Sequence, residues 1–472
     1  MRRCVVTVGL FVLCSVAQAF DPLGSERDLS AVPPLGVVPL DTELVGGSAC
    51  PPPFAGGLIP LSDVVKRALC RDPRARQAWA DASLAAARLG VARAAYLPTV
   101  TGTLSRGRAG QTTGQGGSTL RNDGTSRVGQ LDLAWNLFDF GQREANVDSA
   151  RQTLLAAAAS HNLTIQNVFL DAANAYFSLL NAQGELTVAQ EVERINLQSF
   201  MAAEAKHAAG VGDLSAKLQT QTAFAQAILT RVKAEGALRN AQGQLAVSIG
   251  ESPDRQIAVD ADDARLPDAD FVKGMADLLE AAQQAHPELR AARARLNAAR
   301  ARIAVADRAY LPTVSLNATR ANTTRDFDSN VAGLDQRDRS VTVQINVPVF
   351  DGFARHYQGR AARAEFELAD ADLRSTEQKV ALEVWQAYQT LESQTHALDS
   401  TLKLLGFATK SLEVAQGRYK AGVGSTLELL EAQRAMADAA QQRINALSSW
   451  RATRLRLAAS LGRLGFWSVS GS

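Results

Sequence analysis

The acidic pair Glu428 and Glu431 is the first candidate for chemistry in this chain of 472 residues. Residues three apart lie on one face of a helix, so the two carboxylates would point the same way. Such a pair attracts cations, and the alternative is that both are ordinary solvated surface glutamates. The pair follows a glycine-rich reversal, Gly422-Val423-Gly424, and the same tripeptide stands at Gly210-Val211-Gly212.

Catalysis and nucleic-acid binding find no support in the sequence. The five histidines are scattered without metal-ligand spacing, at His161, His207, His286, His356 and His396. There is no P-loop, no nucleophile elbow and no H-E-x-x-H motif. The 50 basic and 48 acidic residues nearly balance, which argues against a nucleic-acid partner. We therefore expect no enzyme, no cofactor and no metal.

The elements that hold the acidic pair belong to an internal duplication. The sequence pattern of residues 92–250 is repeated at residues 306–462. The six residues Ala95 to Val100 return unchanged as Ala309 to Val314, and the glycine reversal returns 212 positions later. A duplication of this size predicts two similar structural units in one chain.

Alternation of apolar and polar residues predicts four strands, because period two gives a strand one apolar face. The clearest runs are Leu131 to Leu137, Val314 to Ala318 and Val341 to Val349, with a weaker one from Thr99 to Ser105. The strands would form two hairpins. A small soluble sheet packed on helices is the alternative.

The connections within these hairpins are polar. Gly110 to Ser126 is rich in Gly, Thr, Gln and Asn, and Ala321 to Arg339 is rich in Asn, Asp and Arg. Both therefore predict exposed loops.

A heptad pattern predicts very long helices. The stretch from Gln142 to Ala208 has no proline, and about 65 residues span roughly 100 Å at 1.5 Å per residue. The a and d positions of its heptads form a seam of Ile165, Val168, Ala172, Ala175, Leu179, Ala182, Leu186 and Ala189. The same register 212 positions later contains Glu377, Val380, Val384, Ala387, Leu391, Gln394, Leu398 and Thr401. Shorter helices, Leu61 to Ala95 and Val272 to Ala309, lead into each hairpin.

The N-terminus predicts export from the cytoplasm. Arg2 and Arg3, an apolar run and Ala17-Gln18-Ala19 form a secretory signal with an A-x-A cleavage site. Only Cys50 and Cys70 then remain. In an oxidising compartment they would be able to form a disulfide, and the sequence leaves this open.

The order of these parts gives the expected organisation. We predict a signal peptide (1–19), an irregular segment (20–60), a first repeat (61–250: hairpin 98–138, long helix 142–208, return helix 214–249), a linker (251–271), a second repeat (272–462: hairpin 312–350, long helix 352–420, return helix 426–461) and a tail (463–472).

Four strands cannot close a membrane barrel, and an open edge in lipid leaves backbone groups unsatisfied. Several chains must therefore share one barrel, and three chains give twelve strands. The predicted fold class is α+β and mostly α. A long antiparallel coiled coil forms a helical barrel, and each chain adds four strands to a trimeric twelve-strand transmembrane β-barrel.

The run Arg418 to Gln433 resembles the second helical turn of the TolC-type outer-membrane efflux proteins. Tyr-Leu-Pro at 96–98 and 310–312 is similar to that family too, as is Val349 to Gly352. The resemblance covers Leu61 to Gly462. It implies a trimer with a barrel in the outer membrane and a twelve-helix tunnel across the periplasm.

The resemblance also implies partners and sites. The partners are two more copies of the chain, a periplasmic adaptor, an inner-membrane ABC transporter (alternatively an RND pump), an exported protein and outer-membrane lipid. Glu428 and Glu431 match the positions of an acidic constriction ring. The implied adaptor contacts are Gly210, Val211, Gly212, Gly422, Val423 and Gly424. The alternative is that these glycines merely let the chain reverse.

Three functions stay open at this stage. The first is a passive exit duct for a protein toxin in a type I secretion system. The second is the outer-membrane channel of a small-molecule drug-efflux pump. The third is a soluble periplasmic coiled-coil scaffold.

Overall fold

The computed structural model describes residues 21–30, 50–52, 57–115, 118–259, 275–328, 333–462 and 464. The predicted signal peptide lies outside the described residues. So do much of the 20–60 segment, most of the 251–271 linker and nearly all of the 463–472 tail.

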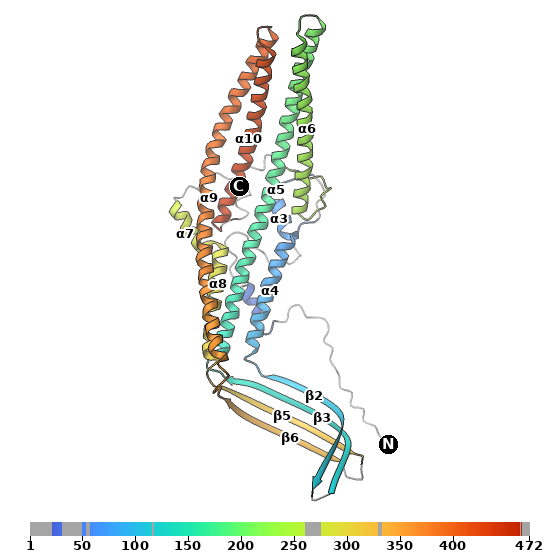
Figure 1. Cartoon of the computed structure of the whole chain (residues 1–472), viewed down its shortest axis with the longest axis vertical. Coiled ribbons are helices and arrows are strands. Elements are labelled where there is room, and N and C mark those ends of the chain that lie inside the picture. The colour runs from blue at the N-terminus through green and yellow to red at the C-terminus, as the bar shows by residue number, and fades with distance from the viewer. Residues whose placement is uncertain are drawn as a thin grey trace. The chain divides into compact units, whose positions relative to one another are not determined.

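The described elements alternate between long helices and a small number of strands (Figure 1). In chain order they are α1 (Ser25–Ser30), β1 (Leu58–Ile59), α3 (Leu61–Arg71), α4 (Pro73–Ala94), β2 (Thr99–Gln115), β3 (Ser118–Phe138), α5 (Gln142–Ala208), α6 (Leu214–Ser248), β4 (Ala258–Val259), α7 (Met275–Ala285), α8 (Pro287–Arg308), β5 (Thr313–Phe327), β6 (Leu334–Asn346), α9 (Ala354–Lys420) and α10 (Thr426–Ser460).

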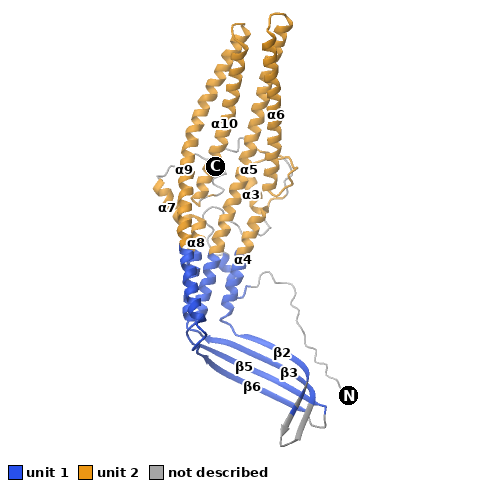
Figure 2. Ribbon diagram, viewed as in Figure 1, with its two compact units in different colours: residues 1–32, 82–155, 294–370 blue, residues 33–81, 156–293, 371–472 orange. Residues whose placement is uncertain are grey.

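The chain divides into two compact units, and each unit takes segments from both sequence repeats (Figure 2). Unit 1 comprises residues 1–32, 82–155 and 294–370. Unit 2 comprises residues 33–81, 156–293 and 371–472. The spatial division therefore cuts across the repeats, because a single amphipathic helical hairpin cannot bury its apolar face alone.

Unit 1 contains a four-stranded antiparallel sheet with the order β2-β3-β5-β6. Each repeat contributes one hairpin, with Thr99 opposite Ala134 in the first and Thr313 opposite Asn346 in the second. The two repeats join where β3 pairs with β5. The four strands and two hairpins are those that the alternation predicts.

The predicted hairpin loops are wrong in extent. The range 110–126 is mostly strand, since β2 runs to Gln115 and β3 starts at Ser118. The range 321–339 is likewise mostly strand, because β5 runs to Phe327 and β6 starts at Leu334. Backbone hydrogen bonds between the strands form whatever the side chains are. A strand made of polar residues therefore lacks the alternation of apolar and polar residues by which a strand is recognised in a sequence.

The two predicted lead-in helices are each broken in the structure. The predicted 61–95 helix ends as α3 at Arg71 and restarts as α4 at Pro73. The predicted 272–309 helix has the same break between α7 and Pro287, the first residue of α8. Proline has no N–H to donate, so it is tolerated in the first turn of a helix but interrupts a helix interior.

The core of unit 2 follows the predicted heptad seam. In α5 the seam buries Ile165, Val168, Ala172, Leu179, Ala182 and Ala189, and in α9 it buries Val380, Val384 and Ala387. All of the α5 set except Ala189 packs with α3, α6 and α10 in one apolar cluster. The register therefore holds in both copies, although residue identity changes and Glu377 at one seam position is exposed.

Two further contacts shape unit 2. Cys50 and Cys70 form a disulfide, with a Cα–Cα distance of 5.7 Å. The short strands β1 and β4 pair in parallel. Within the part of the chain that the structure describes, no helix combines the length and the apolarity that crossing a bilayer requires.

Candidate functional site: the two glycine turns

The first glycine turn ends α5 and starts α6. Gly210 has φ of 73°, its N–H donates to the carbonyl of His207 at 3.0 Å, and the N–H of Val211 donates to the carbonyl of Lys206 at 3.1 Å. These two bonds are the Schellman pattern, in which a left-handed residue satisfies the last carbonyls of a helix. Asp213 then caps α6, accepting the N–H of Ser215 at 3.2 Å.

The second turn repeats this geometry between α9 and α10. Gly422 has φ of 77°, and its N–H donates to the carbonyl of Tyr419 at 3.2 Å. The N–H of Val423 donates to the carbonyl of Arg418 at 3.0 Å. Ser425 is the cap here and accepts the N–H of Glu428 at 3.1 Å.

The second glycine of each turn is required for a different reason. A Cβ on Gly212 would lie 2.7 Å from the backbone nitrogen of His207. A Cβ on Gly424 would lie 2.9 Å from the Cβ of Arg418. Reversal of the chain thus accounts for all four glycines, and a role for them in adaptor contact stays a prediction.

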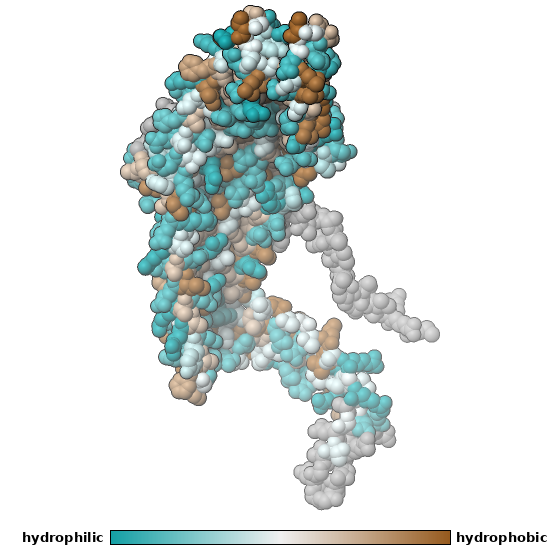
Figure 3. All heavy atoms as spheres, turned by 45° about the horizontal axis from the view of Figure 1, so that its top comes forward, coloured by the Kyte–Doolittle hydropathy of each residue, from teal (hydrophilic) through white to brown (hydrophobic). Residues whose placement is uncertain are grey.

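The valine side chains of the two turns are exposed, and the reversal of the chain uses only the backbone of these residues. Val211 is 79% exposed and Val423 is 69% exposed. Leu214 and Leu427, in the first turn of α6 and α10, are also exposed. Figure 3 shows apolar surface at the ends of both helical hairpins. Exposed apolar residues clustered at a tip are typical of a surface that contacts a partner.

The two candidate glutamates differ in their surroundings. Glu428 pairs with Arg418 across the second turn, with 3.0 Å between Nε and Oε1. Glu431 is exposed and makes no ion pair with any described residue. Arg418 therefore balances one of the two charges locally. Sequence reasoning missed this arginine, because it lies in α9 while both glutamates lie in α10.

Lys206 ties the first hairpin to the second, and sequence reasoning missed it too. Its Nζ donates to the carbonyl of Tyr419 at 3.2 Å and lies 4.0 Å from the centre of the Tyr419 ring. A second pair, Lys217 with Glu204 at 3.0 Å, holds α6 to α5. Charged contacts thus join the helices at both turns.

A groove of about 1430 Å³ runs along α5, α6 and α10 just behind the turns. It is lined by apolar and polar side chains, among them Val188, Leu218, Leu427, Glu431 and Arg434. Both hairpins contribute to it, so a partner seated in the groove would contact both repeats.

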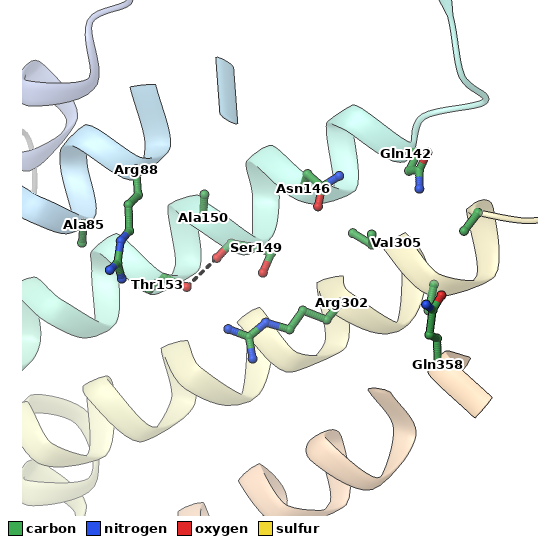
Figure 4. Close-up of a pocket in the computed structure, with 12 residues that line it drawn as sticks. Ala85, Arg88, Gln142, Asn146, Ser149, Ala150, Thr153, Arg302, Val305 and Gln358 are labelled. Carbon is green, nitrogen blue, oxygen red and sulfur yellow. Dashed lines mark hydrogen bonds between the residues drawn. The ribbon is translucent and has the colours of Figure 1, made fainter. Parts of the chain in front are cut away.

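Unit 1 has its own hollow, between α4, α5, α8 and α9 (Figure 4). In Figure 4, Asn146 and Ser149 point from α5 toward α8. The Ser149 hydroxyl donates to the carbonyl of Ala298 at 3.3 Å, and Arg302 pairs with Glu365 at 3.4 Å. The lining contains no carboxylate, histidine or cysteine, so it offers no acid–base pair for catalysis.

Two of the histidines are buried. His161 and His286 are almost fully buried, and burial lowers the pKa of each imidazole, which keeps both neutral at pH 7. The ring of His161 packs edge-on against Trp79, with centroids 5.7 Å apart. The described residues hold no group of three or more His, Cys, Asp or Glu arranged for a metal ion.

With this fold and these turns in view, comparison with known proteins defines the class of protein. The chain belongs to the outer membrane efflux protein family, whose model matches residues 64–251 and again 278–463. The two matches coincide with the two repeats. The protein is therefore an export channel component of the outer membrane.

The chain is similar to individual outer-membrane channel proteins over most of its length. The chain is 33% identical to Protein CyaE of Bordetella pertussis over 428 residues, which is 89% of this chain and 88% of the relative. It is 24% identical to the toluene efflux pump outer membrane protein TtgC of Pseudomonas putida, over 86% of this chain and 83% of the relative. The crystal structure of the outer membrane protein VceC of Vibrio cholerae superimposes with a TM-score of 0.73 at 20% identity, covering 86% of this chain and 96% of that one.

Proposed function

We propose that the protein is the passive exit duct of a tripartite export system and that it works as a trimer. Each chain would add β2, β3, β5 and β6 to a twelve-strand barrel in the outer membrane. What supports this is the sheet itself, since β2 and β6 leave two unpaired edges that lipid does not tolerate. Other copies of the chain supply the missing strands.

The helical hairpins would then form the periplasmic tunnel. Their tips would bind a periplasmic adaptor, and the exposed Val211 and Val423 are the anchors we assign to that contact. An inner-membrane ABC transporter would provide the energy, since the sequence contains no P-loop motif for binding ATP. An RND pump is the alternative partner.

At the tunnel mouth, Glu428 and Glu431 would form the acidic constriction. Three chains bring six carboxylates together, but the pairing of Arg418 with Glu428 offsets three of them. Three copies of Glu431 would then carry most of the net negative charge. A ring of this kind attracts cations and concentrates them at the mouth.

The observation that favours a protein substrate is the greater likeness to Protein CyaE, a component of cyclolysin (adenylate cyclase toxin) secretion, than to the toluene pump component. We therefore assign the chain to type I secretion of a protein toxin. Small-molecule efflux remains the second candidate, since TtgC shares the same repeats over most of this chain. A soluble scaffold does not agree with membership of an outer-membrane family.

Complementation separates these two functions. The chain is expressed in cells that lack their own channels of this family, once with the ABC transporter and adaptor of a type I system and once with an RND pump and its adaptor. We expect release of the protein substrate to the medium in the first strain and no gain of resistance to small toxic compounds in the second. Resistance without protein release would contradict the type I assignment.

A further inference from the structure

The sheet of unit 1 carries a row of arginines on its apolar face. Register places Arg106 of β2 directly opposite Arg127 of β3, and Arg320 of β5 directly opposite Arg339 of β6. Residues opposite each other share a face, and alternate residues of one strand share it too. Leu104, Leu131, Ala318 and Val341 therefore lie on the same face as the arginines.

In every strand the apolar residues stop where the arginine begins. On this face of β2 the residue next to Leu104 is Arg106. On the same face of β6 the residue next to Val341 is Arg339. The pattern recurs in both repeats, because Arg106 and Arg320 differ by the same 214 positions as the Leu-Pro motifs. Arg127 and Arg339 differ by the 212 positions of the glycine turns.

Two facing arginine pairs are unfavourable unless an anion lies between them. Arg106, Arg320 and Arg339 are exposed, and each lacks an ion pair to any residue that the structure describes. Arg127 makes one long ion pair among the described residues, 3.8 Å to Asp326. The row therefore presents three guanidinium groups that no described residue pairs, and a fourth that is paired only at long distance.

A second row of exposed aromatic residues marks the other border of the apolar face. Phe138 ends β3, Tyr96 and Tyr310 lie in the turns just before β2 and β5, and Phe350 lies four residues after β6; all four are exposed. Each stands ten or eleven residues from the arginine of its own strand. Arg127 and Phe138 both lie in β3, and their eleven-residue separation at about 3.3 Å per residue and a tilt of ~40° spans about 28 Å, close to the ~25 Å height of the apolar band in outer-membrane proteins.

The two rows also run parallel across the sheet. Between β3 and β5, Arg127 faces Thr324, which lies four residues beyond Arg320. At the other border, Phe138 faces Val314, which also lies four residues beyond Tyr310. Both rows therefore shift by four residues between β3 and β5. Strands that tilt in a barrel need such a shift if all residues of one row are to lie at the same depth in the membrane.

We propose that Arg106, Arg127, Arg320 and Arg339 bind the phosphates of phosphorylated lipid headgroups in the outer leaflet. A guanidinium binds phosphate oxygens through two parallel hydrogen bonds, and a phosphate between facing arginines relieves their repulsion. A lipid fits because it alone joins an anionic head to apolar chains, and the row adjoins the apolar face directly. The proposal rests on the proposed membrane assembly of this sheet.

Lipid binding to the purified full-length trimer tests the proposal. The trimer in neutral detergent is titrated with bisphosphorylated lipid A and, separately, with dephosphorylated lipid A, and native mass spectrometry counts the bound lipids. Arg320→Gln is compared with Arg325→Gln, a matched control because Arg325 lies on the same strand but on the opposite face. Arg320→Lys, which retains the charge, serves where the glutamine variant does not assemble.

We expect tight binding of the phosphorylated lipid alone. Arg320→Gln should weaken it about fivefold, the effect of one basic residue at an anionic surface, and Arg320→Gln with Arg339→Gln about 25-fold. Arg325→Gln should change it less than twofold, and inorganic phosphate should not displace the lipid. Equal binding of both lipids, equal loss in both single variants, or displacement by inorganic phosphate would each overturn the proposal. A parent protein that forms no membrane trimer would instead overturn the proposed function.

Discussion

Placing a charge on either face of β6 distinguishes a lipid-facing from a lumen-facing position. Ile345 and Gln344 are neighbours, so their side chains leave the sheet on opposite faces. Ile345 lies opposite Val314, and Gln344 lies opposite Ser315. We predict that Ile345→Arg impairs assembly strongly and that Gln344→Arg, which adds the same side chain one position away, impairs it little.

The magnitude follows from where Ile345 lies between the two borders of the apolar face. It stands five residues from Phe350 and six from Arg339, which places it near the middle of the band. An arginine facing lipid at the midplane costs about 2–4 kcal/mol. Three chains carry the substitution, so the trimer would lose roughly 6–12 kcal/mol. Gln344→Arg should cost less than about 1 kcal/mol, as most solvated surface substitutions do.

The assay compares the two variants in outer-membrane fractions. Trimer yield is measured by heat-dependent mobility in gels, and unfolding in urea gives the free-energy difference. We expect a near-complete loss of trimer for Ile345→Arg and a yield close to the parent for Gln344→Arg. Equal yields, or a greater loss for Gln344→Arg, would refute the assignment of the faces or the membrane role of the sheet.

Further predictions concern the second glycine turn. The double variant Glu428→Ala, Glu431→Ala should still form trimers but lose block by polyvalent cations and cation preference in planar bilayers. Arg418→Ala should raise cation preference, because it frees the charge of Glu428. Unchanged conductance and block in both would refute the constriction. Gly422→Ala should destabilise the turn by about 1 kcal/mol, since its φ is positive, and speed proteolysis there. Gly417→Ala, where a Cβ meets nothing within 4 Å, should not.

The parts of the fold that periodicity encodes are readable from the sequence. The heptad seam of α5 predicts its buried residues, because residues three or four apart lie on the same face of a helix. The burial of Val384 and Ala387 shows that the same register is kept in α9. The reversals at Gly210 and Gly422 are readable as well, since a left-handed residue at a helix end favours glycine.

Other features depend on signals that periodicity does not carry. The polar segments that end β2 at Gln115 and begin β3 at Ser118 are strands held by backbone ladders, and their residue types show no alternation. Pro73 and Pro287 each begin a new helix, but the helical spacing of apolar residues continues across both prolines. That spacing therefore predicts one continuous helix where the structure has two.

Tertiary contacts at the site lay beyond sequence reasoning. Arg418 meets Glu428 only because the chain turns back on itself, and Lys206 meets Tyr419 only because two hairpins from different repeats lie side by side. Local spacing fixes which residues share a helix face, whereas these pairs join different helices. The arginine row likewise emerges only when strand register is known.

The mass of the detergent-solubilised protein tests most directly whether this chain is a shared outer-membrane duct. The protein is extracted from carbonate-washed outer membranes, and light scattering after size exclusion gives the protein mass without the detergent. We expect about three times the mass of the mature chain, in a species that carbonate does not release. A monomer released by the carbonate wash would contradict it, because four strands of a single chain cannot form a closed barrel in lipid.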